Sequence, residues 1–419
     1  MPRLKFKPNS AIHAHQWFLL IVAITTLMPM SINNLAIMFL LVYSFFKLNK
    51  EQLSWSTPQI LFLFLFLSAV VTLIYAQDLM KGVKSLEKIL NFLLFPLIFA
   101  TVKITKKDIK KILLSFALVT FLGLMIAYII SLKNTLQNGS IYIFNPKNLV
   151  IENVFKYHRL SSNIGLHPTY LSSYTLFSLV IIAHYYLKEE FLNTKKRFYC
   201  FILILYFGVS LYLLNSFAVL VSAILLVPVY FLFHQKIKKV YLILIAIPLL
   251  ILASKVLFSK TRNFTNKISY EYTDTPRSSN WNSINSRLAK WSCTLEVIED
   301  YFPFGIGKGN GREALIEKYE EKGFELGYIN KYTAHNMYLT FMMETGILGL
   351  LLFIILIGYL IILSIRKKSF LLISIAILLA ITSITEDVLE RNKGIVFYSF
   401  FILLITANLK YLQNHDSKA

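Results

Sequence analysis

Long apolar runs separated by short polar connections follow one another along most of the chain. A helix needs roughly 20 predominantly apolar residues to cross a hydrocarbon core about 30 Å thick, and most of these runs approach that length. The expected spans lie near residues 16–31, 34–48, 58–76, 86–102, 112–132, 169–188, 198–214, 216–233, 239–258, 337–363, 370–386 and 394–412. The pattern therefore predicts an all-α integral membrane protein with about twelve transmembrane helices.

Composition supports a membrane protein and overrules the several soluble domains that length alone would suggest. Hydrophobic residues make up 56% of the 419 residues. Two connections are long, at residues 132–168 and 259–334, and loops of that size between bundled helices are typically functional. We expect an N-terminal membrane bundle of about nine helices over 1–258, a large outer loop carrying short helices over 259–334, and about three C-terminal membrane helices over 335–419.

The net charge of +21 is distributed unevenly between the connections. Lysine and arginine concentrate in alternate connections, which the positive-inside rule assigns to the cytoplasm. These residues are Arg3, Lys5, Lys7, Lys103, Lys106, Lys107, Lys110, Lys111, Lys195, Lys196, Arg197, Lys236, Lys238, Lys239, Arg366, Lys367 and Lys368. We therefore expect both termini in the cytoplasm and the two long connections on the outer, periplasmic side. Lys81, Lys84 and Lys88 are an exception, because they fall on the predicted outer side.

The first residues and the cysteines bear on processing and on disulfides. Residues 1–14 are basic but lead into a full-length span without a small-residue cleavage pattern, which favours a first membrane helix over a removable signal peptide.

Cys200 is expected near the cytoplasmic face and Cys293 in an outer loop, so the two cannot pair. Neither a disulfide framework nor a metal site is expected.

Within the second long connection, "SRLAKWSCTLEVIEDYFPFGIGKGNGREAL" (residues 286–315) divides into a helix and a glycine-rich turn. Apolar residues recur at three- and four-residue spacing, which predicts a helix over residues 286–301. These apolar positions are Leu288, Trp291, Leu295 and Ile298. Arg287, Lys290 and Trp291 place a basic face beside an aromatic one. An amphipathic helix lying at the membrane interface would show the same pattern, so that alternative stays open.

The turn "FGIGKGNG" (residues 304–311) does not fit a nucleotide-binding loop. It lacks a Lys-Ser/Thr pair after the glycines, it follows no strand, and it lies on the predicted outer side, away from ATP. Its backbone N–H groups could still meet an oxygen-rich ligand, and that weaker interpretation is left open.

Polar residues gather at the predicted outer ends of several spans. They are His167 in "GLHPTYLSSY", His335 and Asn336, and the group Glu386, Asp387, Glu390 and Arg391 in "ITEDVLERNKG". A lone histidine is often only an interface residue, and the last group can be an ion-paired helix end in which Arg391 pairs with Asp387 four residues earlier. Two histidines and two arginines on one side favour a functional site, because ionisable groups near lipid are costly.

The stretch "TAHNMYLTFMMETGILGL" (residues 333–350) divides by helical phase. If the helix begins near residue 336, His335 and Glu344 face opposite ways, so Glu344 is expected to bond to a neighbouring helix or loop. Gly346 and Gly349 are expected to allow close backbone approach at a helix crossing. His335 lies at the loop junction, where it can point into an outer vestibule.

The order of these motifs resembles the O-antigen ligase and polymerase superfamily of bacterial surface-polysaccharide synthesis. The matching elements are Arg287 with Trp291, "PFGIGKGN" (residues 303–310) and "HNMYLTFMMETGILGL" (residues 335–350). "HPTYLSSY" (residues 167–174) and "TEDVLERNKGIVFYSFF" (residues 385–401) look like versions found in ligase-like members. The resemblance covers the layout of spans and is strongest over residues 166–401.

The resemblance implies glycosyl transfer at the outer face of the bacterial inner membrane, in lipopolysaccharide or other polysaccharide biosynthesis. A glycan carried on undecaprenyl diphosphate would move, with inversion and without a metal or other cofactor, onto a sugar hydroxyl of lipid A-core, as in an O-antigen ligase. The implied partners are the lipid-linked donor, a glycolipid or glycan acceptor and membrane lipids, with no nucleic acid.

The same resemblance assigns roles to residues. Arg287 is expected to stabilise charge developing on the leaving diphosphate, because guanidinium stays protonated and binds phosphate bidentately. His335 is expected to act as base on the acceptor hydroxyl, since histidine titrates near neutral pH and such a base typically contributes ~10²–10⁴ in rate. The substrate-binding candidates are Asn336, Lys290, His167, Arg391 and Arg159, and the structural supports are Glu344, Gly346, Gly349 and Trp291.

One position departs from the family pattern. Many relatives carry an arginine in a Ser-Arg-Gly-like turn at the start of a middle span, whereas "LNSFAVLVSA" (residues 214–223) has Phe217 there. Either Arg159 or Arg391 substitutes for that arginine, or the phosphate is held differently.

Two alternatives to the ligase hypothesis remain. A repeat-unit polymerase of the same superfamily would share these motifs. A transporter of lipid-linked oligosaccharide belongs to another class, and it would typically place ionisable residues and broken helices near the membrane midplane. Here the polar residues lie at the outer ends of spans, which favours chemistry over translocation. Donor glycan, acceptor and oligomeric state are left open by the sequence.

Overall fold

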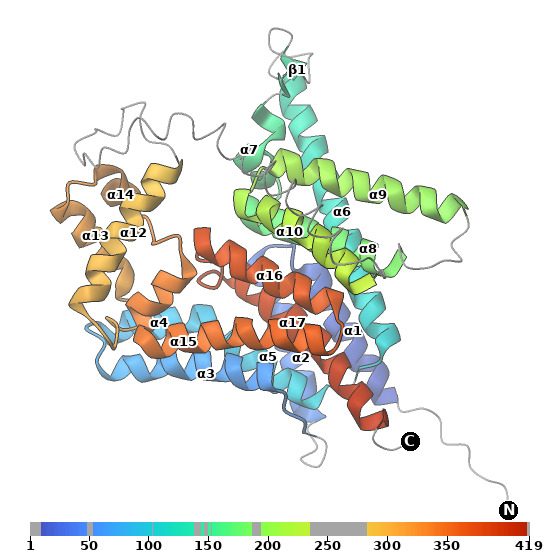
Figure 1. The fold of residues 1–419 in the computed structure, drawn as a ribbon, viewed down its shortest axis with the longest axis horizontal. Helices are drawn as coiled ribbons and strands as arrows, with labels where there is room; N and C mark the ends of the chain where they lie inside the picture. Colours follow the sequence, from blue (N-terminus) through green and yellow to red (C-terminus); the bar gives the residue numbers. More distant parts are fainter. Residues whose placement is uncertain are drawn as a thin grey trace, which may run out of the picture. The chain divides into compact units, whose positions relative to one another are not determined.

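The computed structural model of the protein describes residues 10–47, 53–102, 104–137, 144–145, 150–151, 153–186, 194–234 and 283–416 (Figure 1). The expected span at residues 239–258 and the expected domain boundary at residue 258 lie outside the described residues. The division into three sequence-continuous parts therefore stays a prediction.

Helices make up nearly all of the described regular structure. They are α1 (Ser10–Thr25), α2 (Met30–Phe46), α3 (Thr57–Val71), α4 (Leu79–Ile89), α5 (Asn91–Thr101), α6 (Lys106–Gln137), α7 (Tyr157–Ser162), α8 (Pro168–Tyr186), α9 (Thr194–Leu214), α10 (Phe217–His234), α12 (Ser283–Asp300), α13 (Gly311–Glu321), α14 (Glu325–Asn330), α15 (Met337–Arg366), α16 (Phe370–Thr385) and α17 (Asn392–Asp416). Two residue pairs, β1 (Phe144–Asn145) and β2 (Val150–Ile151), form an antiparallel ladder.

Several helices have the length and apolarity of membrane spans. Three described helical segments meet both criteria, at Thr57–Ile74, Lys106–Gln137 and Met337–Arg366, and shorter apolar helices surround them in the sequence. The predicted all-α membrane fold is confirmed, while the number of crossings stays a prediction.

The span expected at residues 86–102 is divided into two helices. Asp78 caps α4 by accepting a hydrogen bond from the backbone N–H of Lys81 at 3.0 Å, and α5 begins only at Asn91. Lys81, Lys84 and Lys88 are exposed on the short helix α4. The three lysines that break the charge rule therefore belong to a separate polar helix and not to the end of a span.

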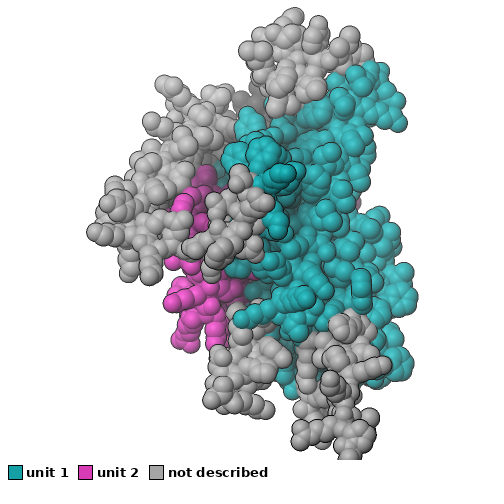
Figure 2. Space-filling view, turned by 90° about the vertical axis from the view of Figure 1, so that its right-hand side faces the viewer, with its two compact units in different colours: residues 1–59, 94–220, 400–419 teal, residues 60–93, 221–399 magenta. Residues whose placement is uncertain are grey.

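The described chain forms two compact units, coloured separately in Figure 2. Unit 1 comprises residues 1–59, 94–220 and 400–419, and unit 2 comprises residues 60–93 and 221–399. Each unit combines segments that are distant in sequence.

The core of unit 1 contains an aromatic cluster between α6, α8 and the end of α17. Phe116 is fully buried, and its ring centroid lies 5.7 Å from that of Tyr174, 6.1 Å from that of Phe177 and 4.6 Å from that of Phe401. Such aromatic contacts add to the apolar area that the helices bury. They bring the C-terminal helix onto two helices that precede it by more than two hundred residues.

Unit 2 contains a small bundle made from α12, α13 and α14. Its core joins Cys293 of α12, Tyr319 of α13, and Phe324 and Ala334 from the following loops. The apolar face predicted for α12 is partly wrong, because Leu295 is 49% exposed. Of the predicted positions, Ile298 is buried. The other buried residues of the helix are Ala289, Lys290, Cys293, Thr294 and Val297, and the small Ala289 and Cys293 allow close packing on its neighbours.

Helix α15 is interrupted at Gly346, whose φ of 66° and ψ of −162° are not helical. The break places the backbone N–H of Ile347 against the carbonyl of Pro303 at 2.9 Å. A Cβ on Gly346 would lie 2.3 Å from that carbonyl oxygen, so only glycine fits. The close approach predicted for Gly346 is therefore present, but its partner is a loop and not a crossing helix.

The glycine-rich turn occupies the space that this break opens. Backbone N–H groups of Ile306 and Gly307 donate to the carbonyls of Met343 and Glu344 at 2.8 and 3.1 Å, and the N–H of Lys308 donates to Thr72 Oγ1 at 2.9 Å. These three N–H groups serve the fold and are not available to an oxygen-rich ligand. For the other N–H groups of the turn, ligand binding stays a prediction.

The predicted role of Gly349 at a helix crossing is also not what the structure shows. A Cβ built on Gly349 would meet first the side chains of Thr345 and Phe341, which belong to the same helix. The residue makes room for Thr345, whose hydroxyl bonds back to the carbonyl of Phe341 at 2.8 Å.

Candidate active site

The turn that precedes α15 is held by the carboxylate of Asp387. His335 has a left-handed backbone, with φ of 49°. Asp387 accepts hydrogen bonds from the backbone N–H of His335 at 3.0 Å and of Asn336 at 2.9 Å, and from the Thr340 hydroxyl at 2.8 Å. Asn336 Oδ1 caps α15 by accepting from two backbone N–H groups of its first turn. Together these bonds fix the position from which the His335 imidazole projects.

Glu386 connects the imidazole to the guanidinium predicted to act with it. Its Oε2 atom lies 3.0 Å from His335 Nδ1, and its Oε1 atom lies 3.2 Å from Arg287 Nη2. Arg287 Nε also donates to the carbonyl of Thr385 at 3.4 Å. The side chains of His335 and Arg287 are 27% and 23% exposed, so both are held firmly yet reachable from outside. One carboxylate thus sets the relative position of the two residues.

Lys290 lies one helical turn beyond Arg287 on α12 and is buried. Its ammonium lies 4.6 Å from the centroid of the Tyr332 ring, a distance suited to a cation–π contact. Burial and the charge of Arg287 lower the pKa of Lys290 to about 8, against the opposing effect of Glu386 and Asp387. The site therefore holds a second cation that loses its proton at mildly alkaline pH.

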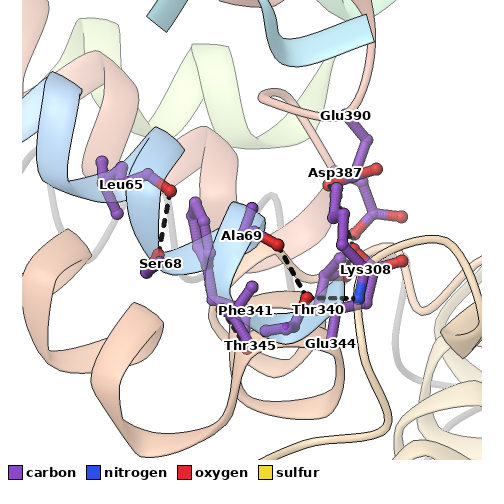
Figure 3. Close-up of polar contacts among 11 residues, drawn as sticks. Leu65, Ser68, Ala69, Lys308, Thr340, Phe341, Glu344, Thr345, Asp387 and Glu390 are labelled. Atoms are coloured by element: carbon purple, nitrogen blue, oxygen red, sulfur yellow. Dashed lines mark hydrogen bonds and ion pairs between the residues drawn. The ribbon is translucent and has the colours of Figure 1, made fainter. Parts of the chain in front are cut away.

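Beside this site lies a buried ionic centre formed by Lys308, Glu344 and Glu390, shown with Thr340 and Asp387 in Figure 3. The Lys308 ammonium lies 2.5 Å from Glu344 Oε2 and also binds the carboxylate of Glu390. Burial acts to lower the pKa of Lys308, but the two carboxylates outweigh it and raise that pKa above its ordinary value. Burial, opposed by Lys308 and reinforced by Glu344, raises the pKa of Glu390 to about 7. The expectation that Glu344 bonds to a neighbouring loop is confirmed.

The acidic group at residues 386–391 is not the helix end that its spacing suggested. Helix α16 ends at Thr385 and α17 begins at Asn392, so Glu386, Asp387 and Glu390 lie in a turn. Asp387 and Arg391 are therefore not one turn apart on a helix, as the predicted ion pair requires. The Asp387 carboxylate instead accepts hydrogen bonds from donors at the start of α15. The turn directs its carboxylates to three different elements.

The remaining predicted residues lie at other positions. Arg391 is exposed at the start of α17 in unit 2. His167 and Arg159 belong to unit 1, where the His167 ring contacts that of His158 at 4.9 Å and its Nδ1 atom accepts from the N–H of Thr169 at 3.4 Å. Arg159 is exposed on α7. The substrate-binding roles of these residues stay predictions.

Two sequence-based expectations concern Trp291 as a structural support and the absence of a metal site. Trp291 is half-buried on α12, and its Nε1 atom has no hydrogen-bond partner among the described residues. Among the same residues, no group of three or more His, Cys, Asp or Glu side chains could hold a metal ion.

Three residues of this candidate site receive no catalytic or binding role from the sequence: Glu386, Asp387 and Lys308. In the sequence, Glu386 and Asp387 appear only as part of a charged cluster, and Lys308 only as part of a glycine-rich turn. The signal that points to them is the presence of ionisable side chains beside apolar helices. Their partners could not be named, because Glu386 and Arg287 are 99 residues apart in sequence.

A family model matches the part of the chain that contains several residues of this site. Residues 201–354 match the family model described as O-antigen ligase, and this stretch includes Arg287, Lys308 and His335. This match supports membership of the O-antigen ligase superfamily. No curated protein matches the chain. The match also supports, in general terms, glycan transfer of the ligase or polymerase type by a multi-pass membrane protein. The family implies lipid-linked glycan and glycan or lipid substrates.

Proposed function

We propose that the protein transfers a glycan from undecaprenyl diphosphate to a sugar hydroxyl of lipid A-core, at the outer face of the bacterial inner membrane. The observation that carries the proposal is the contact of the Glu386 carboxylate with both His335 and Arg287. A base for a hydroxyl and a cation for a phosphate leaving group are the two groups that this reaction needs. The charge pattern of the connections supports cytoplasmic termini and an outer location for the site.

His335 would act as the general base through Nε2. The Nδ1 atom lies beside the Glu386 carboxylate, which can only accept a hydrogen bond, so Nδ1 carries the proton and Nε2 retains its lone pair. Nε2 takes the proton of the acceptor hydroxyl as its oxygen attacks the anomeric carbon. The bond between that carbon and the diphosphate oxygen breaks with inversion. Glu386 stabilises the imidazolium that results.

Arg287 would bind the diphosphate as it leaves. Glu386 and the Thr385 carbonyl hold the guanidinium beside the imidazole, and guanidinium remains charged at every physiological pH. Lys290 adds a second positive charge one turn away. Because both cations are in place before the reaction, they stabilise the developing charge without rearrangement. No step requires a metal or other cofactor.

The decisive experiment is reconstitution of the purified protein in liposomes with an undecaprenyl-diphosphate glycan. We expect His335→Ala and Arg287→Ala to lower the transfer rate by ~10² or more, in line with typical losses of a general base or a charge-stabilising group. Arg312→Ala is the control, because Arg312 is exposed on α13 and binds the carbonyl of Lys331. Transfer by both site variants at the wild-type rate would refute the site.

The choice of acceptor distinguishes the ligase from its alternatives. Transfer to lipid A-core supports the ligase, whereas transfer only to a second lipid-linked repeat unit identifies a polymerase. Movement of the donor lipid across the vesicle membrane without a new glycosidic bond would identify a transporter and overturn the enzymatic proposal.

A further inference from the structure

A cavity of about 570 Å³ lies inside unit 1, between helices α6, α8 and α9. Its size is within the ~300–1,000 Å³ typical of pockets for small molecules. All of its lining residues belong to unit 1, whereas His335, Arg287 and Glu386 belong to unit 2. The cavity therefore needs an explanation separate from glycan transfer.

Both lysines of the lining and Tyr186 come from helix ends that meet at one end of the cavity. Lys110 lies in the second turn of α6, Tyr186 is the last residue of α8, and Lys196 lies in the first turn of α9. The Lys110 ammonium lies 5.2 Å from the ring centroid of Tyr185 and 5.9 Å from that of Tyr186, so aromatic rings hold it in place. The cavity thus has a cationic end.

The rest of the lining is apolar and follows the helices away from the lysines. Leu114 and Leu118 continue along α6, and Leu203 and Phe207 continue along α9. At a rise of 1.5 Å per residue, the lining extends about 12 Å along α6 and about 16 Å along α9. A charged end joined to an apolar groove of this length matches an amphiphile and not a compact polar solute.

The net charge of the lining is positive. Two lysines line the cavity, and none of the described lining residues is acidic. Asp108, on the same helix as Lys110, is not in the lining, because its carboxylate accepts hydrogen bonds from Gln16 at 2.6 Å and from Thr105. A ligand with a negatively charged head is therefore favoured over a neutral or zwitterionic one.

We propose that this cavity binds an anionic glycerophospholipid, with the phosphate between Lys110 and Lys196 and an acyl chain along the apolar groove. The lysines belong to the connections that the positive-inside rule assigns to the cytoplasm, where anionic lipids attract basic pockets between transmembrane helices. A bilayer lipid can enter from the side, between the helices. The lipid would link the three helices and stabilise unit 1.

The test uses the full-length protein in detergent, titrated with phosphatidylglycerol or phosphatidylcholine while bound lipid is counted by native mass spectrometry and the melting temperature is recorded. We expect phosphatidylglycerol to bind and raise the melting temperature, and phosphatidylcholine to do so weakly. The double variant Lys110→Gln/Lys196→Gln should bind phosphatidylglycerol roughly tenfold to thirtyfold more weakly, since each lysine near a lipid surface contributes a factor of about five.

The matched control is Lys107→Gln/Lys111→Gln, which removes the same charge from exposed positions on α6 outside the lining. It should retain phosphatidylglycerol binding within about twofold of the wild type. Equal weakening in the two double variants, or equal binding of the two lipids, would overturn the proposal, because attraction would then be nonspecific.

Two further measurements distinguish binding of the whole lipid from binding of its phosphate alone. Inorganic phosphate should neither raise the melting temperature as phosphatidylglycerol does nor compete with it, and if it did both, the cavity would be a phosphate site and not a lipid site. Leu114→Trp narrows the apolar groove without changing charge and should weaken phosphatidylglycerol binding. Unchanged binding in a folded Leu114→Trp protein would contradict the acyl-chain assignment.

Discussion

The turn at residues 386–390 contributes carboxylates to two regions of unit 2 that differ in exposure. Glu386 and Asp387 hold His335 and Arg287 in a partly open site, whereas Glu390 meets Lys308 and Glu344 in a buried centre. The side chain of His335 is 27% exposed and that of Lys308 only 4%. One turn therefore both arranges the side chains of the proposed site and connects them to the broken helix α15.

The two regions should respond differently to mutation. In the buried centre, removal of one partner leaves another charge without compensation in a medium that solvates it poorly. In the open site, water can replace a lost ion pair, so the cost appears in orientation and rate. Stability measurements should therefore report on the buried centre and kinetic measurements on the open site.

The largest effect is expected from Lys308→Met. The substitution leaves the carboxylates of Glu344 and Glu390 facing each other in a buried space, and breaking such a pair typically costs ~3–5 kcal/mol of unfolding free energy. Thermal unfolding in detergent, followed by circular dichroism, measures the loss. Lys308→Arg should recover part of it, because the positive charge is kept.

A surface pair provides the control for that experiment. Lys322 lies 2.8 Å from Glu296, with the two side chains 35% and 32% exposed. Lys322→Met should cost only about 0–1 kcal/mol, as exposed ion pairs usually do. If Lys308→Met were as mild as Lys322→Met, the buried centre would not anchor the turn.

The second prediction concerns Glu386→Gln, which should slow transfer while leaving the fold intact. The amide cannot stabilise an imidazolium as a carboxylate does, and it offers a donor as well as an acceptor to the His335 ring. We expect kcat to fall by ~10², within the range that general-base catalysis contributes, with little change in KM for the acceptor. Steady-state kinetics in proteoliposomes measures both constants.

Glu390→Gln is the matched variant from the same turn. It keeps an oxygen that can accept from Lys308, and the pKa of about 7 shows that burial already disfavours the charged carboxylate. We expect kcat within a few-fold of the wild type. A loss equal to that of Glu386→Gln would mean that the turn acts as one unit and that the distinction between the two regions fails.

A third and smaller effect is expected from Asp387→Asn. The N–H groups of His335 and Asn336 donate to different oxygens of Asp387, so the single amide oxygen can accept from only one of them. The NH₂ group then faces the other N–H, which is also a donor. Loss of such a buried hydrogen-bond acceptor costs about 1–3 kcal/mol. The melting temperature should fall less than in Lys308→Met. A melting temperature equal to that of the wild type would show that Asp387 does not hold the turn.

Much of this architecture could be predicted from local patterns. Apolar runs of spanning length located most of the helices, and the helical phase of residues 333–350 correctly separated His335 from Glu344. The family resemblance predicts roles for Arg287 and His335, and the structure brings both side chains to one carboxylate. These predictions depend on the spacing of residues within one or two helical turns or on the motifs of a known family.

Contacts between distant segments could not be predicted in the same way. The turn at residues 386–390 has helical spacing in its sequence, yet its carboxylates bind residues 51 and 99 positions away. On α12, the pattern selected the largest apolar residues, whereas close packing selects the smaller Ala289 and Cys293. A single sequence shows neither the partners of these carboxylates nor the buried face of α12, because both depend on which element packs against them.

The smallest predicted effect is the pH dependence of Lys290, and it distinguishes site chemistry from general unfolding. Its pKa of about 8 lies below the ordinary 10.5 because burial disfavours the ammonium. Between these two values the unfolded chain binds more protons than the folded one, so the contribution of Lys290 to stability rises as pH increases from about 8 towards 10.5. Transfer should fall over the same rise, since a cation beside Arg287 is lost. Melting temperature and rate therefore move in opposite directions. Lys290→Arg should remove both changes, because guanidinium does not titrate there, whereas parallel loss of rate and stability in the wild type would contradict the assignment.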